Sequence, residues 1–318
     1  QQRLALDTLR PWDLAVTLYR DQPLRPFEPG DDLAAKALRL FEHLDPVLAG
    51  QFATMSSEGL LDLDSRKNKA PGGYCDTLHF RGRPFIFMNA AGVMEDVQTL
   101  LHEAGHAFHA FSSHRQRLIW QRHPSAEAAE LASMSMELLA APLLHAPGAF
   151  LTERDGAVAR IEHLEDILVT LCHVAAVDAF QRWIYTSGDG ADRDRRDEAW
   201  LAIRQRFEPL VDWDGLQTER VARWYRQLHI FLYPFYYIEY GIAQLGAIQV
   251  WQNHRRDPVG GLDGYRRFLA LGATAGLPAL YREAGARLVF DREGMAPLVA
   301  VVEAEIGRLR ELLSAPLP

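Results

Sequence analysis

The sequence predicts a mainly α-helical protein of the α+β class, with one small β-hairpin among its helices. Apolar residues recur at helical spacing along most of the chain, whereas a single stretch, residues 73–89, alternates as strands do. The 318 residues are 48% hydrophobic and 24% charged, which supplies enough apolar side chains for a large core. We therefore expect residues 1–318 to form one domain, built as a single body or as two closely packed subdomains.

The first predicted elements are a long amphipathic helix over residues 31–56 and the hairpin over residues 73–89. The two alternating halves of the hairpin flank a turn at Arg81-Gly82-Arg83. Pro84 lacks an amide hydrogen, so it places the second strand near a sheet edge or lies at the start of that strand. An edge strand can pair with an added extended peptide, so the hairpin serves either peptide binding or plain sheet packing.

The segment LLHEAGHAFH contains the pattern His-Glu-x-x-His, in His102, Glu103 and His106. An apolar stripe at helical spacing predicts a helix through this segment; its members are Val97, Leu101, Ala104, Phe108 and Phe111. On a helix, His102 and His106 lie one turn apart on the same face, so both can bind one metal ion while Glu103 faces a metal-bound water. The alternative is that both are ordinary histidines of a half-buried helix.

His109 lies seven residues beyond His102, which is about 10 Å along a helix axis and too far for both side chains to bind one ion. We expect His109 beside the metal site or at the surface. A catalytic zinc has three protein ligands and one open position, so the third ligand has to come from another segment.

Residues 125–144 are the predicted source of that third ligand. Their Ala, Leu, Met and Glu content favours a helix, which Ser125 can cap. Glu127 falls in the first turn, where the helix dipole favours a carboxylate without any catalytic reason, so we assign Glu130 as the ligand. Glu137, on the same face as Glu130, either orients a ligand histidine or is solvated at the surface.

Helical periodicity continues through the C-terminal half. The predicted helices are 157–186, 197–209, 217–229, 236–254, 262–272, 278–285 and 294–314. The polar, Gly-containing run from Ser187 to Glu198 predicts a solvated loop, because it lacks the acidic spacing of a calcium loop.

A second group of polar side chains occurs in the segment HIFLYPFYYIEYG, which starts at His229. If this segment is largely helical, one face presents an imidazole and three phenols, from His229, Tyr233, Tyr236 and Tyr240. Such donors suit an oxyanion. The alternative is an aromatic stripe of the core, and Pro234 can bend or restart the helix.

These segments together resemble the oligoendopeptidase F branch of the thimet oligopeptidase family of zinc metallopeptidases. The run HEAGHAFH is followed by the first Glu of ELASMSMELL, which is Glu130, with 23 residues between it and the second histidine of the metal pattern. The segments LRPWDLA, GGYCDTLHFRGRPFIFMN, VDAFQRWIY, HIFLYPFYYIEYG and FLALGATAGLPALYREAG are also similar to that family, in the expected order. The resemblance covers nearly the whole chain.

The resemblance implies a zincin-like helical catalytic domain over residues 1–318, with a small sheet before the metal-binding helix and one Zn²⁺ per chain. By position, it implies zinc ligands at His102, His106 and Glu130, a general base or acid at Glu103, and groups at the scissile carbonyl from His229 and from Tyr236 or Tyr240. Family members also carry an N-terminal helical region that closes over the groove. We expect that region to be absent from these 318 residues. The groove would then be covered by a second chain, or by the N-terminal part if it is supplied separately.

Composition excludes several other classes. A net charge of −8 without a concentrated basic stripe gives no reason to expect nucleic acid binding. No apolar run reaches the ~20 residues of a membrane span, and no signal leader opens the chain. Cys75 and Cys172 lie far apart in the sequence, which suits a reducing cytoplasm. We expect a soluble cytoplasmic enzyme.

The function that these patterns favour is zinc-dependent endopeptidase activity on short oligopeptides. A metal-activated water would attack the peptide carbonyl and Glu103 would serve as general base. The alternative is a non-catalytic peptide-binding or regulatory remnant that retains the metal site. A metal-dependent deacylase or another hydrolase that uses the same pattern is a third interpretation.

Overall fold

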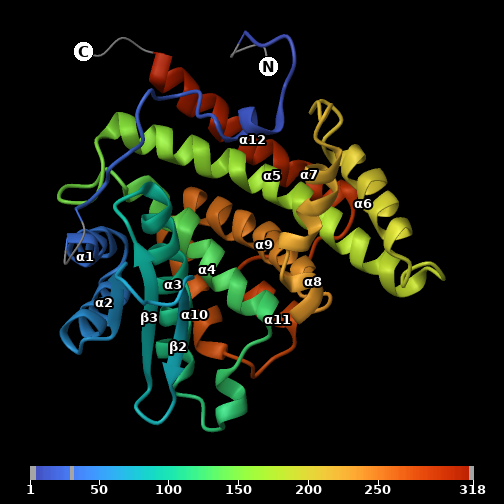
Figure 1. Cartoon of the computed structure of the whole chain (residues 1–318). Coiled ribbons are helices and arrows are strands. Elements are labelled where there is room, and N and C mark those ends of the chain that lie inside the picture. The colour runs from blue at the N-terminus through green and yellow to red at the C-terminus, as the bar shows by residue number, and fades with distance from the viewer. Residues whose placement is uncertain (1–4, 29–31, 315–318) are drawn as a thin grey trace. The chain divides into compact units, whose positions relative to one another are not determined.

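The computed structural model describes residues 5–28 and 32–314, drawn in colour in Figure 1. The chain divides into two compact units. Unit 1 contains the described residues up to 21 and residues 165–241, and unit 2 contains the described residues of 22–164 and those from 242 onward. Most of both units is helical, and the sheet is small, which confirms the predicted fold class.

Unit 2 begins with two helices, α1 (Asp32–Leu44) and α2 (Pro46–Ser57), where one helix over 31–56 was predicted. The predicted continuous helix was wrong, because the helix is interrupted at Asp45. Residue 31 lies outside the described residues. Pro46 occupies the first turn of α2 and cannot donate into a preceding helix. The Asp45 carboxylate accepts from the amides of Val47 and Leu48, so it caps the new helix.

The sheet of unit 2 has three strands in the order β1-β3-β2. The strands β2 (Tyr74–Leu78) and β3 (Arg83–Ala90) pair antiparallel, which confirms the predicted hairpin. Gly82 in the connecting turn has φ +60°, a left-handed conformation that glycine adopts without strain. Pro84 is the second residue of the central strand, so it marks the start of a strand and not an edge.

The third strand, β1 (Leu61–Asp64), was not predicted. It pairs parallel with β3, Leu61 facing Ile86 in register. Four residues, LDLD, are too few for alternation to be recognised in a sequence. Within the described part of unit 2, β2 therefore has a strand on one side only.

Helix α3 (Met94–Ser113) contains the predicted metal-binding pattern and lies against the hairpin (Figure 1). Its predicted apolar stripe is buried from Val97 to Phe108, while Phe111 is half-buried. Phe108 packs edge-on against Phe41 of α1, which in turn packs against Phe52 of α2. These contacts form the apolar core on one face of α3 and leave its histidine face to a different neighbour.

That neighbour is α4 (Ala126–Ala140), followed by a short 3-10 helix, η4 (Ala141–Leu143). The two helices approach closely at Gly105, where an added Cβ would lie 2.6 Å from the Cα of Ser133 and 2.8 Å from the carbonyl oxygen of Ala132. Only glycine leaves room for this backbone contact. Unit 2 is completed by α10 (Pro258–Leu271), α11 (Leu277–Glu283) and α12 (Arg292–Ser314), close to the predicted ranges.

Two helices run from one unit into the other, α5 (Glu153–Thr186) and α9 (Tyr237–Arg256), and both match their predicted ranges closely. By length and composition alone, α5 would be long and apolar enough to cross a membrane. Its side chains Ile161 and Phe180 are buried inside the protein, and core helices of that length meet the same criterion.

Unit 1 has its own core, in which Phe180, Trp200 and Trp224 pack together. Helix α6 (Arg193–Phe207) starts earlier than predicted, because Asp192 caps it within the polar run that we expected to be loop. The predicted helix 217–229 was wrong in its continuity. The structure has α7 (Gln217–Ala222), the 3-10 helix η5 (Arg223–Arg226), and then α8 (His229–Leu232).

The close contact of α3 and α4 predicts the effect of a single methyl group at Gly105. Gly105→Ala has to push the two backbones apart, so we expect the free energy of unfolding to fall by about 1–3 kcal/mol. Thermal and urea unfolding measure this. Gly50→Ala in α2 is the matched control, because no atom lies within 4 Å of its added Cβ; it should stabilise the chain by about 0.5–1 kcal/mol. Equal stability of both variants would contradict the packing argument.

Candidate functional site

The structure brings together the three side chains predicted to bind a metal, His102 and His106 of α3 and Glu130 of α4. One ligand atom from each lies within 4.8 Å of the others. The Oε2 atom of Glu130 is 3.2 Å from Nε2 of His102 and 3.6 Å from Nε2 of His106. Two imidazole nitrogens and one carboxylate oxygen converging on one point are a donor set that suits Zn²⁺ and leaves a fourth position open.

The competing carboxylate, Glu127, has a different environment. It lies in the first turn of α4 and is half-buried, and its backbone carbonyl accepts from the Tyr281 hydroxyl. Glu130 is 6% exposed and accepts a hydrogen bond from the Ser133 hydroxyl at 2.9 Å. Burial raises the pKa of Glu130, but its contacts with the two histidines outweigh burial and lower it overall, so the carboxylate stays charged.

The charges around the two histidines differ. Burial works to lower the pKa of His102, yet hydrogen bonds with Glu130 and Glu137 raise it well above its ordinary value. Burial lowers the pKa of His106 to about 4, and the neighbouring His102 adds to this shift. A metal ion needs neutral imidazole ligands, so metal binding at this site would displace a proton from His102.

Glu137 is not a solvated surface residue. Its carboxylate accepts from Nδ1 of His102 at 2.7 Å and from Nε2 of His163 at 2.9 Å. Burial raises the pKa of Glu137, but the two histidine contacts dominate and lower it to about 2. Glu137 therefore orients the His102 ring, as carboxylates behind metal ligands commonly do. His163 of α5 was missed in the sequence, because no local spacing connects it to a residue in α4.

Glu103 is a residue of α3, is 7% exposed, and has its carboxyl group next to Cys75 of β2. Burial raises the pKa of Glu103 to about 7, although the charge of His102 and the backbone amide of Cys75 act in the opposite direction. A carboxyl group with a pKa near neutrality can accept and return a proton at physiological pH.

His109 is neither at the surface nor a metal ligand. Its ring is 3% exposed, packs 5.3 Å from the Phe268 ring, and has no hydrogen-bond partner at either nitrogen. Burial lowers the pKa of His109 to about 3 and the charge of His106 contributes, so the ring is neutral. His109 acts as a core residue, which the sequence did not reveal because its spacing continues the histidine pattern.

The predicted aromatic group lies in unit 1 and is compact, but it is not one helical face. The ring of His229 is stacked 5.9 Å from Tyr236 and meets Tyr240 edge-on at 5.8 Å, while Tyr233 is 6.4 Å away. Helix α8 ends before Tyr233 because Pro234 disfavours a helical residue before it; Tyr233 has φ −137° and ψ 71°. Phe235 at φ 62° completes the reversal, so a bend brings the tyrosines to His229.

Two neighbours of His229 were missed in the sequence. The ring of Tyr237 lies 5.1 Å from His229, and burial raises the pKa of Tyr237. The side-chain amide of Gln227 lies 2.9 Å from Nδ1 of His229. Gln227 lies two residues before His229, a spacing that does not bring side chains together on a helix, so helical periodicity could not point to it.

The chain is similar to known peptidases along most of its length. The model of Peptidase family M3 matches residues 1–297. Oligopeptidase PepF of Bacillus subtilis is 23% identical over 320 residues, which cover 98% of this chain and 45% of that protein. An oligoendopeptidase F homolog of Borreliella burgdorferi is 22% identical over 256 residues, covering 77% of this chain and 41% of that protein.

Among solved structures, PZ peptidase A with an inhibitor matches with a TM-score of 0.88 and 30% identity, over 96% of this chain and 54% of that chain. The resemblance that the sequence segments indicated is confirmed. The chain spans less than half the length of the Bacillus subtilis and Borreliella burgdorferi relatives.

The two glutamates of α4 predict different metal contents for two variants. Glu130→Ala removes one of three ligands, so we expect it to lose most of the zinc that the unchanged chain binds. Glu127→Ala is the matched control and should alter only helix stability, by about 0.3 kcal/mol. Elemental analysis after dialysis against zinc measures both. A normal zinc content in Glu130→Ala would overturn the ligand assignment.

Proposed function

Because this chain belongs to Peptidase family M3, we propose that it is a zinc-dependent endopeptidase that hydrolyses short oligopeptides. The observation that carries the proposal is the position of a buried carboxyl group, Glu103, on the same helix as two of three converging metal ligands. A site that only binds metal has no need for this group. Bound at His102, His106 and Glu130, a zinc ion would supply Lewis acidity and lower the pKa of water.

Glu103 is the proposed proton carrier. With its pKa near 7, the carboxylate takes a proton from the attacking water and returns it to the leaving amine as the peptide bond breaks. The amide of Cys75 fixes the orientation of this carboxylate from β2. Glu137 holds the Nδ1 proton of His102, so that Nε2 is the nitrogen directed toward Glu130.

The free side of β2 is the proposed place for the peptide backbone. An extended peptide can pair with an unpaired strand edge, and residues of β2 on this side would hold its main chain. Because Cys75 of β2 contacts Glu103, a peptide bound along β2 would pass close to the proton carrier. This geometry favours flexible peptides over folded proteins, since a folded segment cannot offer an extended backbone.

The group around His229 is the proposed source of donors for the oxyanion. Its support is chemical: an imidazole and the phenols of Tyr236 and Tyr240 lie within 6 Å of one another, measured between ring centroids. Hydrogen-bond donors aimed at a developing negative charge lower the barrier of acyl transfer.

The partner and the location of the chain are further parts of the proposal. We propose that a second chain or an N-terminal region covers the metal-binding cluster and the open edge of β2, because the relatives extend well beyond the matched part. Exposed apolar side chains such as Trp120 and Phe80 in unit 2 would suit such a cover. The two free cysteines suit a reducing cytoplasm.

Peptide turnover with and without a chelator tests the function. We expect the zinc-loaded chain to cut an internally quenched peptide of about ten residues, a length that an extended strand site can hold, and the chelator to abolish cleavage. Glu103→Gln keeps the shape of the side chain but cannot carry the proton, so turnover should fall at least ~10²-fold while zinc remains bound. Glu127→Gln is the control and should cleave normally. Absence of cleavage by the zinc-loaded chain would leave only peptide binding.

Removal of single hydroxyls tests the aromatic group. Tyr236→Phe or Tyr240→Phe should lower kcat by about 10²–10³-fold with little change in KM if the lost hydroxyl contacts the oxyanion. Tyr225→Phe is the control, because this hydroxyl donates to Asp197 on an exposed face. Melting temperatures recorded beside the kinetics separate stability from catalysis. If both variants keep full turnover, the tyrosines serve packing alone.

A further inference from the structure

A chain of side-chain hydrogen bonds in unit 1 leads from a buried arginine to His229. Nη1 of Arg204 lies 3.0 Å from Nδ1 of His173, and Nε2 of His173 lies 3.2 Å from Oε1 of Gln227. Nε2 of Gln227 then lies 2.9 Å from Nδ1 of His229. Four separate parts of unit 1 contribute to this chain of bonds: α6, α5, the segment between η5 and α8, and α8 itself, which begins at His229.

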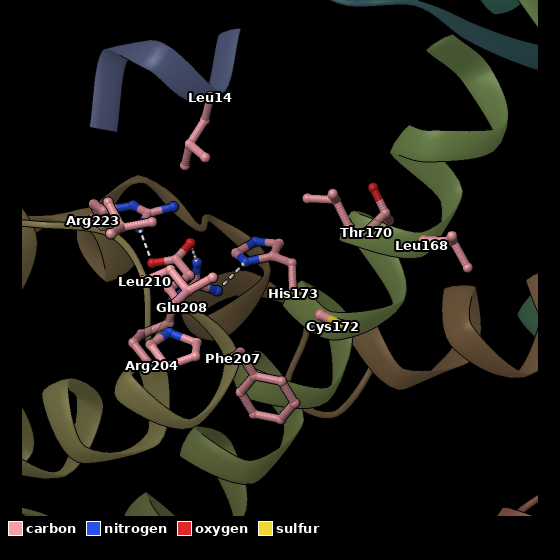
Figure 2. Close-up of a pocket in the computed structure, with 13 residues that line it drawn as sticks. Leu14, Leu168, Thr170, Cys172, His173, Arg204, Phe207, Glu208, Leu210 and Arg223 are labelled. Atoms are coloured by element: carbon pink, nitrogen blue, oxygen red, sulfur yellow. Dashed lines mark hydrogen bonds and ion pairs between the residues drawn. The ribbon is translucent and has the colours of Figure 1, made fainter. Parts of the chain in front are cut away.

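The far end of the chain of bonds is held by an ion pair. Arg204 is 4% exposed and donates to Glu208, which also accepts from Arg223 at 2.7 Å. Figure 2 shows these groups and His173 on the wall of a pocket of about 660 Å³, whose remaining lining is mostly apolar. The guanidinium cannot turn away from His173 without leaving the half-buried Glu208 carboxylate short of a donor.

Arginine gives the chain of bonds a direction, because a guanidinium donates hydrogen bonds and never accepts them. Nδ1 of His173 therefore accepts, which places the proton of this ring on Nε2, where it donates to Oε1 of Gln227. With its oxygen engaged, Gln227 presents its amino group to His229, so Nδ1 of His229 accepts. The proton of neutral His229 then has to be on Nε2.

The charge state of His173 agrees with this assignment. Burial lowers the pKa of His173, and the positive charge of Arg204 acts in the same direction. A second proton on the ring would face the Arg204 guanidinium at Nδ1, where two donors would meet. The ring of Tyr237 lies 5.6 Å from His173 and 5.1 Å from His229, so it packs against both imidazoles and restricts their rotation.

We propose that Arg204, His173 and Gln227 are positioning residues that hold His229 as the tautomer protonated on Nε2. The catalytic meaning of this assignment rests on the proposed function, in which His229 donates to the oxyanion. An imidazole protonated on Nδ1 would present a lone pair at Nε2 and repel a negative oxygen. The hydrogen bonds thus supply the correct donor before substrate arrives, without any charge on His229.

Gln227→Glu tests the direction of the hydrogen bonds with almost no change in shape. A carboxylate at this position accepts from both histidines, so the proton of His229 should move to Nδ1 or the ring should become an imidazolium. Gln205→Glu is the matched control, with the same charge change in an exposed side chain that accepts from Arg220. The readout is nitrogen NMR of histidine-labelled full chain, with the His229 signals assigned by their loss in His229→Gln.

We expect His229 to be protonated on Nε2 in the unchanged chain and in Gln205→Glu, and to change state in Gln227→Glu. A proton on Nδ1 in the unchanged chain, or the same tautomer in Gln227→Glu, would overturn the proposal. A second pair of variants guards against misfolding. His173→Gln retains one acceptor and one donor and should preserve the His229 tautomer, whereas His173→Leu retains neither and should yield a mixture of both tautomers. A pure Nε2 tautomer in a folded His173→Leu also contradicts the proposal.

Kinetics separate the two proposals. If the chain cleaves peptides and the proton of neutral His229 moves to Nδ1 in Gln227→Glu, kcat should fall about 10²-fold with little change in KM, as expected for loss of one oxyanion donor. If the ring becomes an imidazolium, Nε2 still donates and kcat should change little. An unchanged kcat with the proton on Nδ1 would remove His229 from the oxyanion role. If the zinc-loaded chain cleaves nothing, the proposed function fails, while the tautomer measurement still decides the hydrogen-bond assignment, because it needs no turnover.

Discussion

The backbone contact between α3 and α4 at Gly105 is the constraint on which the candidate metal site depends. A side chain at this position would collide with the backbone of Ala132 and Ser133, so only glycine permits the observed separation. At that separation Glu130 comes within 3.2 Å of His102, with the Ser133 hydroxyl fixing its carboxylate. A wider helix separation would move Glu130 away from the two histidines, which matters for a candidate site because metal–ligand bonds are only about 2 Å long.

Electrostatics then determine what each buried group can do. Glu103 and Glu137 lie on neighbouring helices and both are largely buried, and burial acts to raise the pKa of each. The pKa of Glu103 is nevertheless near 7 and that of Glu137 near 2. The difference lies in their partners. Glu137 accepts from His102 and His163, so its charge is balanced, whereas Glu103 has one backbone amide and no cation in hydrogen-bond contact. One carboxylate is thereby suited to hold a ring, and the other to exchange a proton.

In unit 1 an ion pair and two neutral side chains together orient the ring of His229. An ion pair of Arg204 and Glu208 is expensive to bury, but it fixes one donor in place, and each following side chain has only one way to satisfy its neighbour. The donor and acceptor roles set at Arg204 determine those of His173 and Gln227, and through them that of Nδ1 of His229. In the proposed assignment these hydrogen bonds fix the tautomer of a neutral His229 ring, with Gln227 and not a charged group in contact with its Nδ1.

Local pattern in the sequence determined the helical class, the hairpin, and the pairing of His102 with His106, because helical and strand periodicity place residues a few positions apart on a common face. It also favoured Glu130 over Glu127, because the first turn explains a carboxylate at 127 and not one at 130. Tertiary structure alone decided the rest. The break at Asp45-Pro46, the burial of His109, and the contact of His163 with Glu137 follow from packing between segments, which spacing along one segment does not encode. The aromatic group combines a correct and an incorrect prediction. The predicted tyrosines do lie near His229, but a bend at Pro234 brings them there and not a continuous helix face.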